Sequence, residues 1–385
     1  MKYNWEQKKI GDILFHDTKS LEKVSPSVNY PMVGVYSFGK GLFDKETLSG
    51  INTSYKNFYR LSANHIVMSQ LFGWEGAIAL SSPEFEGKYL SSQFPTFLAN
   101  EEKVDRKFIG FYLQQGKIWK LLFAKGRGMG SRRRTLTPEN LLTLEISLPP
   151  LYEQQYIVSK IEEVKTNLEQ IKKLRAEQSK DINNLLFSKY TELIEDAEWL
   201  PMNEVAPIIR RAVELKDEKL YPELGIRCFG KGTFHKSALT GLEVATKKIF
   251  QIKTGDLVFS NVFAWEGGIA VAKEEDNDRY GSHRFISCVA DKEKALTEFL
   301  CFHFLSTKGL QDINACSPGG AGRNKTLGLA KLMKIKVPVP DINLQNEFVE
   351  LQHKVNAIKE HHQQTEKELN ELMPALLDKA FKGEI

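Results

Sequence analysis

The chain has 385 residues, of which 42% are hydrophobic and 26% charged, with a formal net charge of +4. This composition is typical of a soluble globular protein, and the length predicts about two to four folded units, each large enough to bury a core. The N-terminus lacks an apolar signal stretch, and no run approaches the roughly 18 apolar residues of a membrane span, so we expect a cytoplasmic protein with no membrane contact.

The first motif along the chain is GVYSFGKG, at residues 34–41. It imitates the phosphate-binding pattern G-x-x-x-x-G-K-[ST], but Gly41 stands where a Ser or Thr hydroxyl should hold magnesium. The following FDKETLSG also makes a poor start for a helix. Two interpretations stay open, a purely structural turn and a turn that presents Lys40 to DNA.

The next motif, LFGWEGAIAL at residues 71–80, recurs as VFAWEGGIAV at 262–271, which is an offset of 191. At that offset 17 of the 45 positions from Tyr36 to Leu80 are identical, and matches continue to the helical segments beyond. The chain is therefore a tandem duplication. We expect Trp74 and Trp265 to pack in the cores. Their neighbours Glu75 and Glu266 could accept a hydrogen bond from cytosine or cap a buried backbone donor.

A basic stretch follows in the first copy. Residues 106–138 contain nine Lys and Arg and no acidic residue, and six of the nine lie around GRGMGSRRR. Glycines let a loop approach a phosphate backbone closely, and Arg can fork onto phosphate or guanine. The DNA-binding candidates here are Lys125, Arg127, Arg132, Arg133 and Arg134. The alternative is a solvated basic loop without a partner.

Helical patterning then takes over. The sequence LPP at 148–150 predicts a helix entry, and apolar residues from Ile157 to Leu185 follow alternating steps of four and three, with Arg175 and Gln178 at two seam positions. We expect a helix of about 38 residues, roughly 57 Å long at 1.5 Å per residue.

The second copy repeats these features with changes. GIRCFGKG at 225–232 presents Lys231, and the basic residues from Phe299 to Pro340 lie around PGGAGRNK, which adds Arg323, Asn324 and Lys325 to the DNA-binding candidates. All four cysteines, Cys228, Cys288, Cys301 and Cys316, fall in this copy without a C-x-x-C pair. We expect free thiols rather than a zinc site or disulfide framework.

The C-terminal segment carries a second apolar seam, from Phe348 to Leu376, with His362 and Thr365 near its middle. Each long helix needs a partner, and the simplest partner is the other helix, paired antiparallel about a pseudo-two-fold axis. The polar mid-seam residues would then set the register, or they reach water at the seam edge.

No catalytic constellation stands out in either copy. The acidic residues in PEFEGK at 83–88 are too closely spaced for a metal nuclease, the histidines are scattered, and a methyltransferase signature is absent. Two similar globular regions on a helical spacer, each with a basic loop, instead suit duplex DNA as an extended, bipartite target, and the alternatives are a coiled-coil scaffold and a self-contained nuclease or ATPase.

In this order the repeated WEGAIAL and WEGGIAV, FGKG, the basic loop before LPPLYEQQYIV and the terminal LLDKAFKGEI resemble the specificity subunit of Type I restriction-modification systems. The resemblance covers essentially the whole chain. It implies an α/β (α+β) tandem duplication with two globular target recognition domains joined by two long antiparallel coiled-coil helices. The expected boundaries are 1–148 and 195–339 for these domains, and 149–194 and 340–385 for the helices.

The resemblance also implies a function. The subunit is non-catalytic, each target recognition domain reads one half of a split site on double-stranded DNA, and the helices set the gap. Two methyltransferase subunits dock on the helices and bring S-adenosylmethionine, so this chain holds no cofactor or metal, and motor-nuclease subunits join that core.

Overall fold

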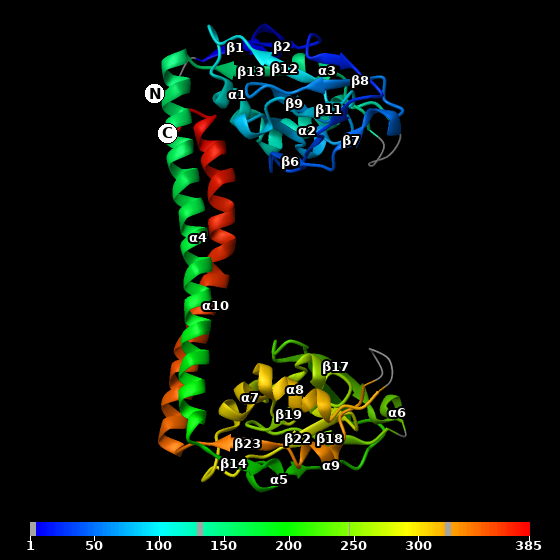
Figure 1. Ribbon diagram of the computed structural model, residues 1–385, viewed down its shortest axis with the longest axis vertical. Coiled ribbons are helices and arrows are strands. Elements are labelled where there is room, and N and C mark those ends of the chain that lie inside the picture. Colours follow the sequence, from blue (N-terminus) through cyan, green and yellow to red (C-terminus); the bar gives the residue numbers. More distant parts are fainter. Residues whose placement is uncertain (1–4, 129–133, 246, 320–324) are drawn as a thin grey trace. The chain divides into compact units, whose positions relative to one another are not determined.

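The computed structural model describes residues 5–128, 134–245, 247–319 and 325–385. The chain divides into two compact units, one formed by residues 1–174 and 363–385 and the other by residues 175–362 (Figure 1). Each unit therefore contains one globular domain and part of both long helices.

The globular domain of the first unit is built on two antiparallel sheets. The four-stranded sheet has the order β10-β9-β12-β2, and the three-stranded sheet has the order β11-β8-β3. Three two-stranded pairs complete it, β5-β6, β4-β7 and β1-β13. The strands are β1 (Glu6–Lys9), β2 (Leu14–His16), β3 (Leu21–Lys23), β4 (Asn29–Tyr30), β5 (Val33–Val35), β6 (Leu42–Asp44), β7 (Leu48–Ser49), β8 (Asn57–Arg60), β9 (Ile66–Met68), β10 (Ile78–Leu80), β11 (Tyr89–Ser91), β12 (Thr96–Ala99) and β13 (Glu145–Leu148).

The second unit repeats this plan. Its sheets have the orders β15-β22-β19-β20, β17-β16-β21-β18 and β14-β23. The strands are β14 (Glu198–Pro201), β15 (Ile208–Ile209), β16 (Leu220–Ile226), β17 (Thr233–Thr240), β18 (Ile249–Gln251), β19 (Leu257–Ser260), β20 (Ile269–Val271), β21 (Tyr280–Ser282), β22 (Phe285–Cys288) and β23 (Lys336–Val339).

The central strands are buried on both faces, which explains their continuous apolar sequences. In β9, Ile66 and Met68 face a core that includes helix side chains, whereas Val67 faces the second sheet. In β19, Leu257 and Phe259 face the helices and Val258 faces the opposite core. Alternate side chains of an extended strand point to opposite faces, so each domain is layered as helices, sheet and sheet.

Short helices cover one face of each main sheet. In the first unit these are α1 (Arg106–Leu113), α2 (Gly116–Lys125) and α3 (Pro138–Leu142). In the second they are α5 (Met202–Val205), α7 (Thr297–Leu305), α8 (Thr307–Ala315) and α9 (Leu329–Leu332), whereas α6 (Gly241–Val244) packs beside β17 of the other sheet. One-turn helices lie at η1 (Ile10–Asp12), η2 (Gly50–Asn52), η3 (Gly73–Glu75), η4 (Pro83–Phe85), η5 (Ala264–Glu266) and η6 (Glu274–Asp276).

Both predicted long helices are present, as α4 (Leu151–Glu195) and α10 (Ile342–Ala380). Each is fixed to its domain by a buried glutamine in its first turns. The Gln154 carboxamide accepts from Asp105 N at 2.8 Å and donates to the Lys103 and Pro149 carbonyls at 3.1 and 2.8 Å. Gln345 makes the equivalent set with Leu296 N and the carbonyls of Lys294 and Pro340. The oxygen and the nitrogen of each carboxamide thus pair with one backbone amide and two backbone carbonyls, which ties the helix entry to its domain.

The two long helices pack together and run antiparallel, as predicted. In the first unit the start of α4 packs with the end of α10, where Ile157 and Ile161 share a core with Leu377 and Phe381 (Figure 1). In the second unit the end of α4, through Leu186 and Tyr190, shares a core with residues near the start of α10.

The predicted seam shifts by one residue toward the helix ends. Leu185, on the predicted stripe, is 53% exposed, whereas Leu186 is buried. An α-helix has 3.6 residues per turn, so a strict heptad stripe drifts around it by about 20° per heptad. At its end α4 also packs on the globular domain, which takes up Leu186, Tyr190 and Leu193.

All four cysteines are free thiols, and Cys288 is buried in the second core. Within the described ranges, none of the helices is long and apolar enough to cross a membrane.

Candidate nucleic-acid interface

The FGKG motif forms the turn of a β-hairpin in each copy. In the first copy it joins β5 to β6, and Tyr36 N donates to Gly41 O at 2.9 Å; in the second it joins β16 to β17, and Arg227 N donates to Gly232 O at 2.9 Å. A strand, and not a helix, follows each lysine, so the turn lacks the helix N-terminus with which a phosphate-binding loop cradles its nucleotide.

The FGKG turn is hydrogen-bonded to the WEG motif, which forms η3 and η5. Phe38 N donates to Glu75 O at 2.8 Å, and Gly39 N to Gly76 O at 3.0 Å. The second copy repeats both bonds, from Phe229 N to Glu266 O at 2.8 Å and from Gly230 N to Gly267 O at 2.9 Å. Two motifs that lie about 35 residues apart in sequence therefore form one assembly in each domain.

Glycine is required after Glu75 for two reasons. Gly76 has a φ of 80°, and a Cβ there would lie 2.4 Å from Cε2 of Trp119. The left-handed backbone and the close aromatic ring together account for the glycine.

The tryptophans of this motif pack at the edges of the cores. Trp74 and Trp265 are half-buried against the first and second cores, and their indole N–H groups donate to Leu71 O at 2.8 Å and Val262 O at 3.0 Å. The prediction that both tryptophans pack against the cores is confirmed, although each is only partly buried.

The neighbouring carboxylates face the FGKG turn. Glu75 accepts from the Ser37 hydroxyl at 3.5 Å, and Glu266 accepts from the Cys228 thiol at the same distance. Burial, followed by the hydrogen bond to Glu266, raises the pKa of the Cys228 thiol, so this cysteine is a poor nucleophile.

The base of the basic loop is attached to the strand that leads into the WEG motif. Leu136 N donates to Gln70 O, and Leu327 N donates to Asn261 O, both at 2.8 Å. In the first copy Arg127 and Thr135 also exchange backbone hydrogen bonds at 3.1 and 2.9 Å. FGKG, WEG and the basic loop thus meet on one part of each domain, and we call this three-part set the motif assembly.

Two candidate cations stabilise the motif assembly itself. The Arg134 guanidinium lies 4.1 Å from the Phe123 ring centroid and donates to Phe123 O at 2.8 Å and Gly126 O at 3.3 Å. Lys325, at the equivalent position, lies 4.8 Å from the Trp265 ring and donates to Asn314 Oδ1 at 2.6 Å. Cations over aromatic faces are favourable, so both residues hold the loop base in place.

The other described candidates are more exposed. Lys40 and Lys231 extend from the FGKG turns, Arg127 is exposed, and Lys125 donates to the Thr143 hydroxyl at 3.1 Å. Arg132, Arg133, Arg323 and Asn324 lie outside the described residues.

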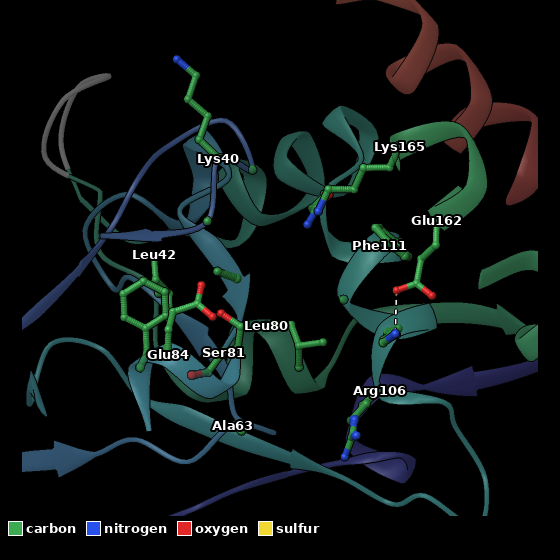
Figure 2. Close-up of a pocket in the computed structure, with 18 of the residues that line it drawn as sticks. Lys40, Leu42, Ala63, Leu80, Ser81, Glu84, Arg106, Phe111, Glu162 and Lys165 are labelled. Atoms are coloured by element: carbon green, nitrogen blue, oxygen red, sulfur yellow. Dashed lines mark hydrogen bonds and ion pairs between the residues drawn. The ribbon is translucent and has the colours of Figure 1, made fainter. Parts of the chain in front are cut away.

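In the first unit Lys40 borders a cleft of about 980 Å³ between the domain and α4. Figure 2 shows Lys40 at one side of this cleft and Lys165 of α4 at the other. Its charged lining residues are five basic and three acidic, namely Lys40, Arg106, Lys107, Lys165, Lys172, Glu84, Glu162 and Glu169. Lys107 is paired with Glu162 at 2.6 Å and Lys165 with Glu169 at 4.0 Å, so two of the three acids offset part of the positive lining.

No metal centre is found within the described part of the chain, because it brings together no group of three or more His, Cys, Asp or Glu side chains suited to an ion. The site offers backbone donors, cations and aromatic rings, which suit binding to a polyanion.

Comparison with known proteins assigns the family. The model of the Type I restriction modification DNA specificity domain matches residues 2–178 and again 195–371. The chain belongs to this family. No curated protein sequence matches it.

Two solved structures share the fold of this specificity subunit. The HsdS subunit from Thermoanaerobacter tengcongensis matches with a TM-score of 0.63 at 20% identity, covering 100% of this chain and 98% of that one. A chain from a structural study of complex assembly and conformational transition of the type I R-M system matches with a TM-score of 0.71 at 20% identity, covering 100% and 99%.

Several residues of the specificity subunit that shape its motif assembly or fix its helix entries were not singled out from sequence. The exposed Phe38 and Phe229 and the buried Gln154 and Gln345 are the main ones. The internal repeat was the available signal, since each of these pairs is identical at the offset of 191.

Proposed function

We propose that this chain is the DNA-reading subunit of a Type I modification complex and that each globular domain reads one half of a bipartite site on duplex DNA. The observation that carries the proposal is the motif assembly, which recurs in both domains with the same backbone bonds. Phosphate contacts fix register on a duplex, and base contacts in the grooves give specificity. A rigid assembly with exposed cations and variable neighbours suits both tasks.

The two motif assemblies carry different side chains just before the FGKG turn, as two domains that read different half-sites would. Tyr36 stacks on Phe43 in the first copy, with centroids 4.1 Å apart, and in the second Arg227 lies 5.0 Å from the equivalent Phe234 ring. The candidate DNA contacts remain Lys40, Lys125, Arg127, Lys231 and the basic-loop residues already named. A common frame that presents different side chains supports two domains with different sequence preferences.

Catalysis belongs to partner subunits in this proposal. Two methyltransferase subunits bind S-adenosylmethionine and methylate adenine, and motor-nuclease subunits join the resulting core. The outer surface of α4 supports helix docking, because Tyr152 and Tyr156 are 74% and 52% exposed one helical turn apart. Clustered exposed aromatic side chains commonly mark protein interfaces.

The test is co-expression of this chain with methyltransferase subunits encoded in the same genome, followed by mapping of methylated adenines on genomic DNA. We expect methylation at one split motif that depends on both proteins. A stable complex that methylates no motif would instead favour a coiled-coil scaffold, and turnover of DNA or ATP by the purified chain alone would favour a self-contained enzyme.

The docking surface is tested in the same assay with Tyr152→Lys together with Tyr156→Lys. This change places charge on the exposed side of α4 and should abolish co-purification of the methyltransferase while the thermal unfolding temperature stays the same. Ile51→Ala, at an exposed apolar residue of the same unit, is the matched control and should retain both.

A further inference from the structure

Phe38 and Phe229 occupy a strained backbone conformation at the same place in both copies. Their φ angles are 61° and 60°, in the left-handed region that disfavours bulky L-residues. Among the described residues only two other non-glycine positions, Ala245 and Asp278, have a positive φ. At the equivalent of Asp278 the first copy uses Gly87, whereas phenylalanine is present in both copies at 38 and 229.

The rings do not offset this strain by burial. Phe38 is 62% exposed and Phe229 is 75% exposed. The Phe38 ring meets Trp119 only edge-on, with centroids 6.4 Å apart, and the Phe229 ring has the Lys231 ammonium 6.0 Å away. A glycine would adopt the same turn without strain, as Gly39 and Gly230 do one residue later. Strain of this kind is characteristic of functional positions.

The backbone beneath each ring is fixed. The amide of each phenylalanine is one of two donors that join the FGKG turn to the WEG motif, so its ring projects from a hydrogen-bonded point of the motif assembly. A second exposed phenylalanine precedes each WEG turn, Phe72 in the first copy and Phe263 in the second. Each domain thus presents two exposed rings and one lysine on a single rigid turn pair.

Charge indicates which partner these rings meet. Lys40 and Lys231 follow the phenylalanines by two residues, and the base of each basic loop is hydrogen-bonded just before the same WEG motif, at Gln70 and Asn261. The carboxylates of the WEG motifs, Glu75 and Glu266, accept hydrogen bonds from within the turn. An aromatic ring among cations suits a nucleic acid, where it can pack on a base face, wedge between base steps or contact a thymine methyl.

We propose that Phe38 and Phe229 are base-contacting residues, one in each half-site, and that the strained FGKG turn serves to present them to the DNA. This inference rests on the proposed function and adds to it an uncharged contact between a phenylalanine ring and a base in each half-site.

The test compares Phe38→Gly and Phe229→Gly in the full complex with methyltransferase subunits, bound to a duplex carrying the motif found by methylation mapping. Glycine relieves the strain, so each variant should be at least as stable as the wild type to thermal unfolding. Affinity for the duplex should fall about tenfold or more, with an unchanged slope of log K against log salt, because a phenyl ring neutralises no phosphate.

Lys40→Ala is the contrasting variant, since loss of one phosphate contact should make that slope less negative by about 0.9. Ile51→Ala controls for loss of an exposed apolar side chain. Wild-type affinity for the duplex in both glycine variants would overturn the inference and leave the proposed function intact. The inference would also fail if the variants bound the methyltransferase subunits less well but the complexes that still formed bound DNA with wild-type affinity. A wild-type complex that neither binds nor methylates DNA would overturn both.

Discussion

Arg134 and Lys325 stand at equivalent positions and hold the basic loops by equivalent means. Arg134 places its cation over Phe123, which meets Trp74 of the WEG motif edge-on with ring centroids 5.4 Å apart, and Lys325 places its cation over Trp265 of the WEG motif itself. Among the cations of the first loop, Arg134 is therefore engaged within the chain, and Arg127 is exposed. The two arginines therefore lie in different environments, and Arg127 remains a candidate for DNA contact.

Arg134→Ala and Arg127→Ala should separate these roles. Loss of the ring contact and of two charge-assisted bonds to carbonyls should lower the free energy of unfolding by about 1–3 kcal/mol in Arg134→Ala. Arg127→Ala should change it by less than about 0.5 kcal/mol, because the side chain is exposed. Urea unfolding of the two variants measures this, and equal stabilities would contradict a structural role for Arg134.

His303 gives the second unit a pH-dependent stability. It is buried against Tyr190, whose hydroxyl lies 2.5 Å from Nδ1, and burial lowers its pKa from 6.5 to about 4. Asp312 opposes this shift and Lys308 adds to it, but both effects are smaller than that of burial. Below pH 6.5 the unfolded chain therefore binds a proton that the folded chain excludes.

We expect the stability contributed by His303 to be complete above pH 6.5 and to be lost as the pH falls toward 4, by roughly 2–3 kcal/mol. In the first unit Phe381 stands at the equivalent of Tyr190 and Tyr112 at the equivalent of His303, and these two rings are in contact. The double variant Tyr190→Phe with His303→Tyr therefore copies a pair that the chain already uses. Unfolding free energies at pH 7 and 4.5 should differ less in this double variant than in the wild type. Parallel pH profiles would show that His303 does not contribute.

Among the structural elements, the link between each long helix and its domain depends on one buried glutamine. Gln154 accepts from the amide of Asp105, and Asp105 in turn caps α1 through Lys107 N and Phe108 N. The orientation of α4 is thereby coupled to that of α1 in the first unit.

Gln154→Leu should lower the free energy of unfolding by roughly 2–5 kcal/mol, because it leaves one amide and two carbonyls unpaired in a dry site. Gln154→Glu keeps the acceptor for Asp105 N but loses both donors, so a similar or larger loss is expected. Gln345→Leu is the matched change in the second unit. A loss below about 0.5 kcal/mol in both leucine variants would mean that the glutamines do not fix the helix entries.

The repeat made much of this architecture predictable. The offset of 191 predicted two similar domains, two long helices after proline-bounded strands, and packing roles for Trp74 and Trp265. The seam shift from Leu185 to Leu186 was not predictable, because it depends on the domain against which the helix end packs. The positive φ of Phe38 was also hidden, since phenylalanine does not signal a left-handed turn as glycine does. Hydrogen bonds between motifs tens of residues apart appear only in the fold.

In the whole molecule, the duplication provides a way to test whether each domain reads its own half-site. Residues 5–148 can be replaced by residues 196–339, the equivalent segment at the offset of 191. The transplanted domain brings a copy of His303, which would face Phe381, the equivalent of Tyr190. Phe381→Tyr therefore restores the contact that His303 makes with Tyr190 in the second unit. The resulting chain carries the second domain twice on the original helices.

The decisive measurement is the adenine methylation map of this chain, co-expressed with the methyltransferase subunits, beside that of the wild type. If each domain reads one half-site, the half assigned to the first domain disappears and the half assigned to the second appears twice. An unchanged motif in a complex that still assembles and methylates would contradict half-site reading by the globular domains.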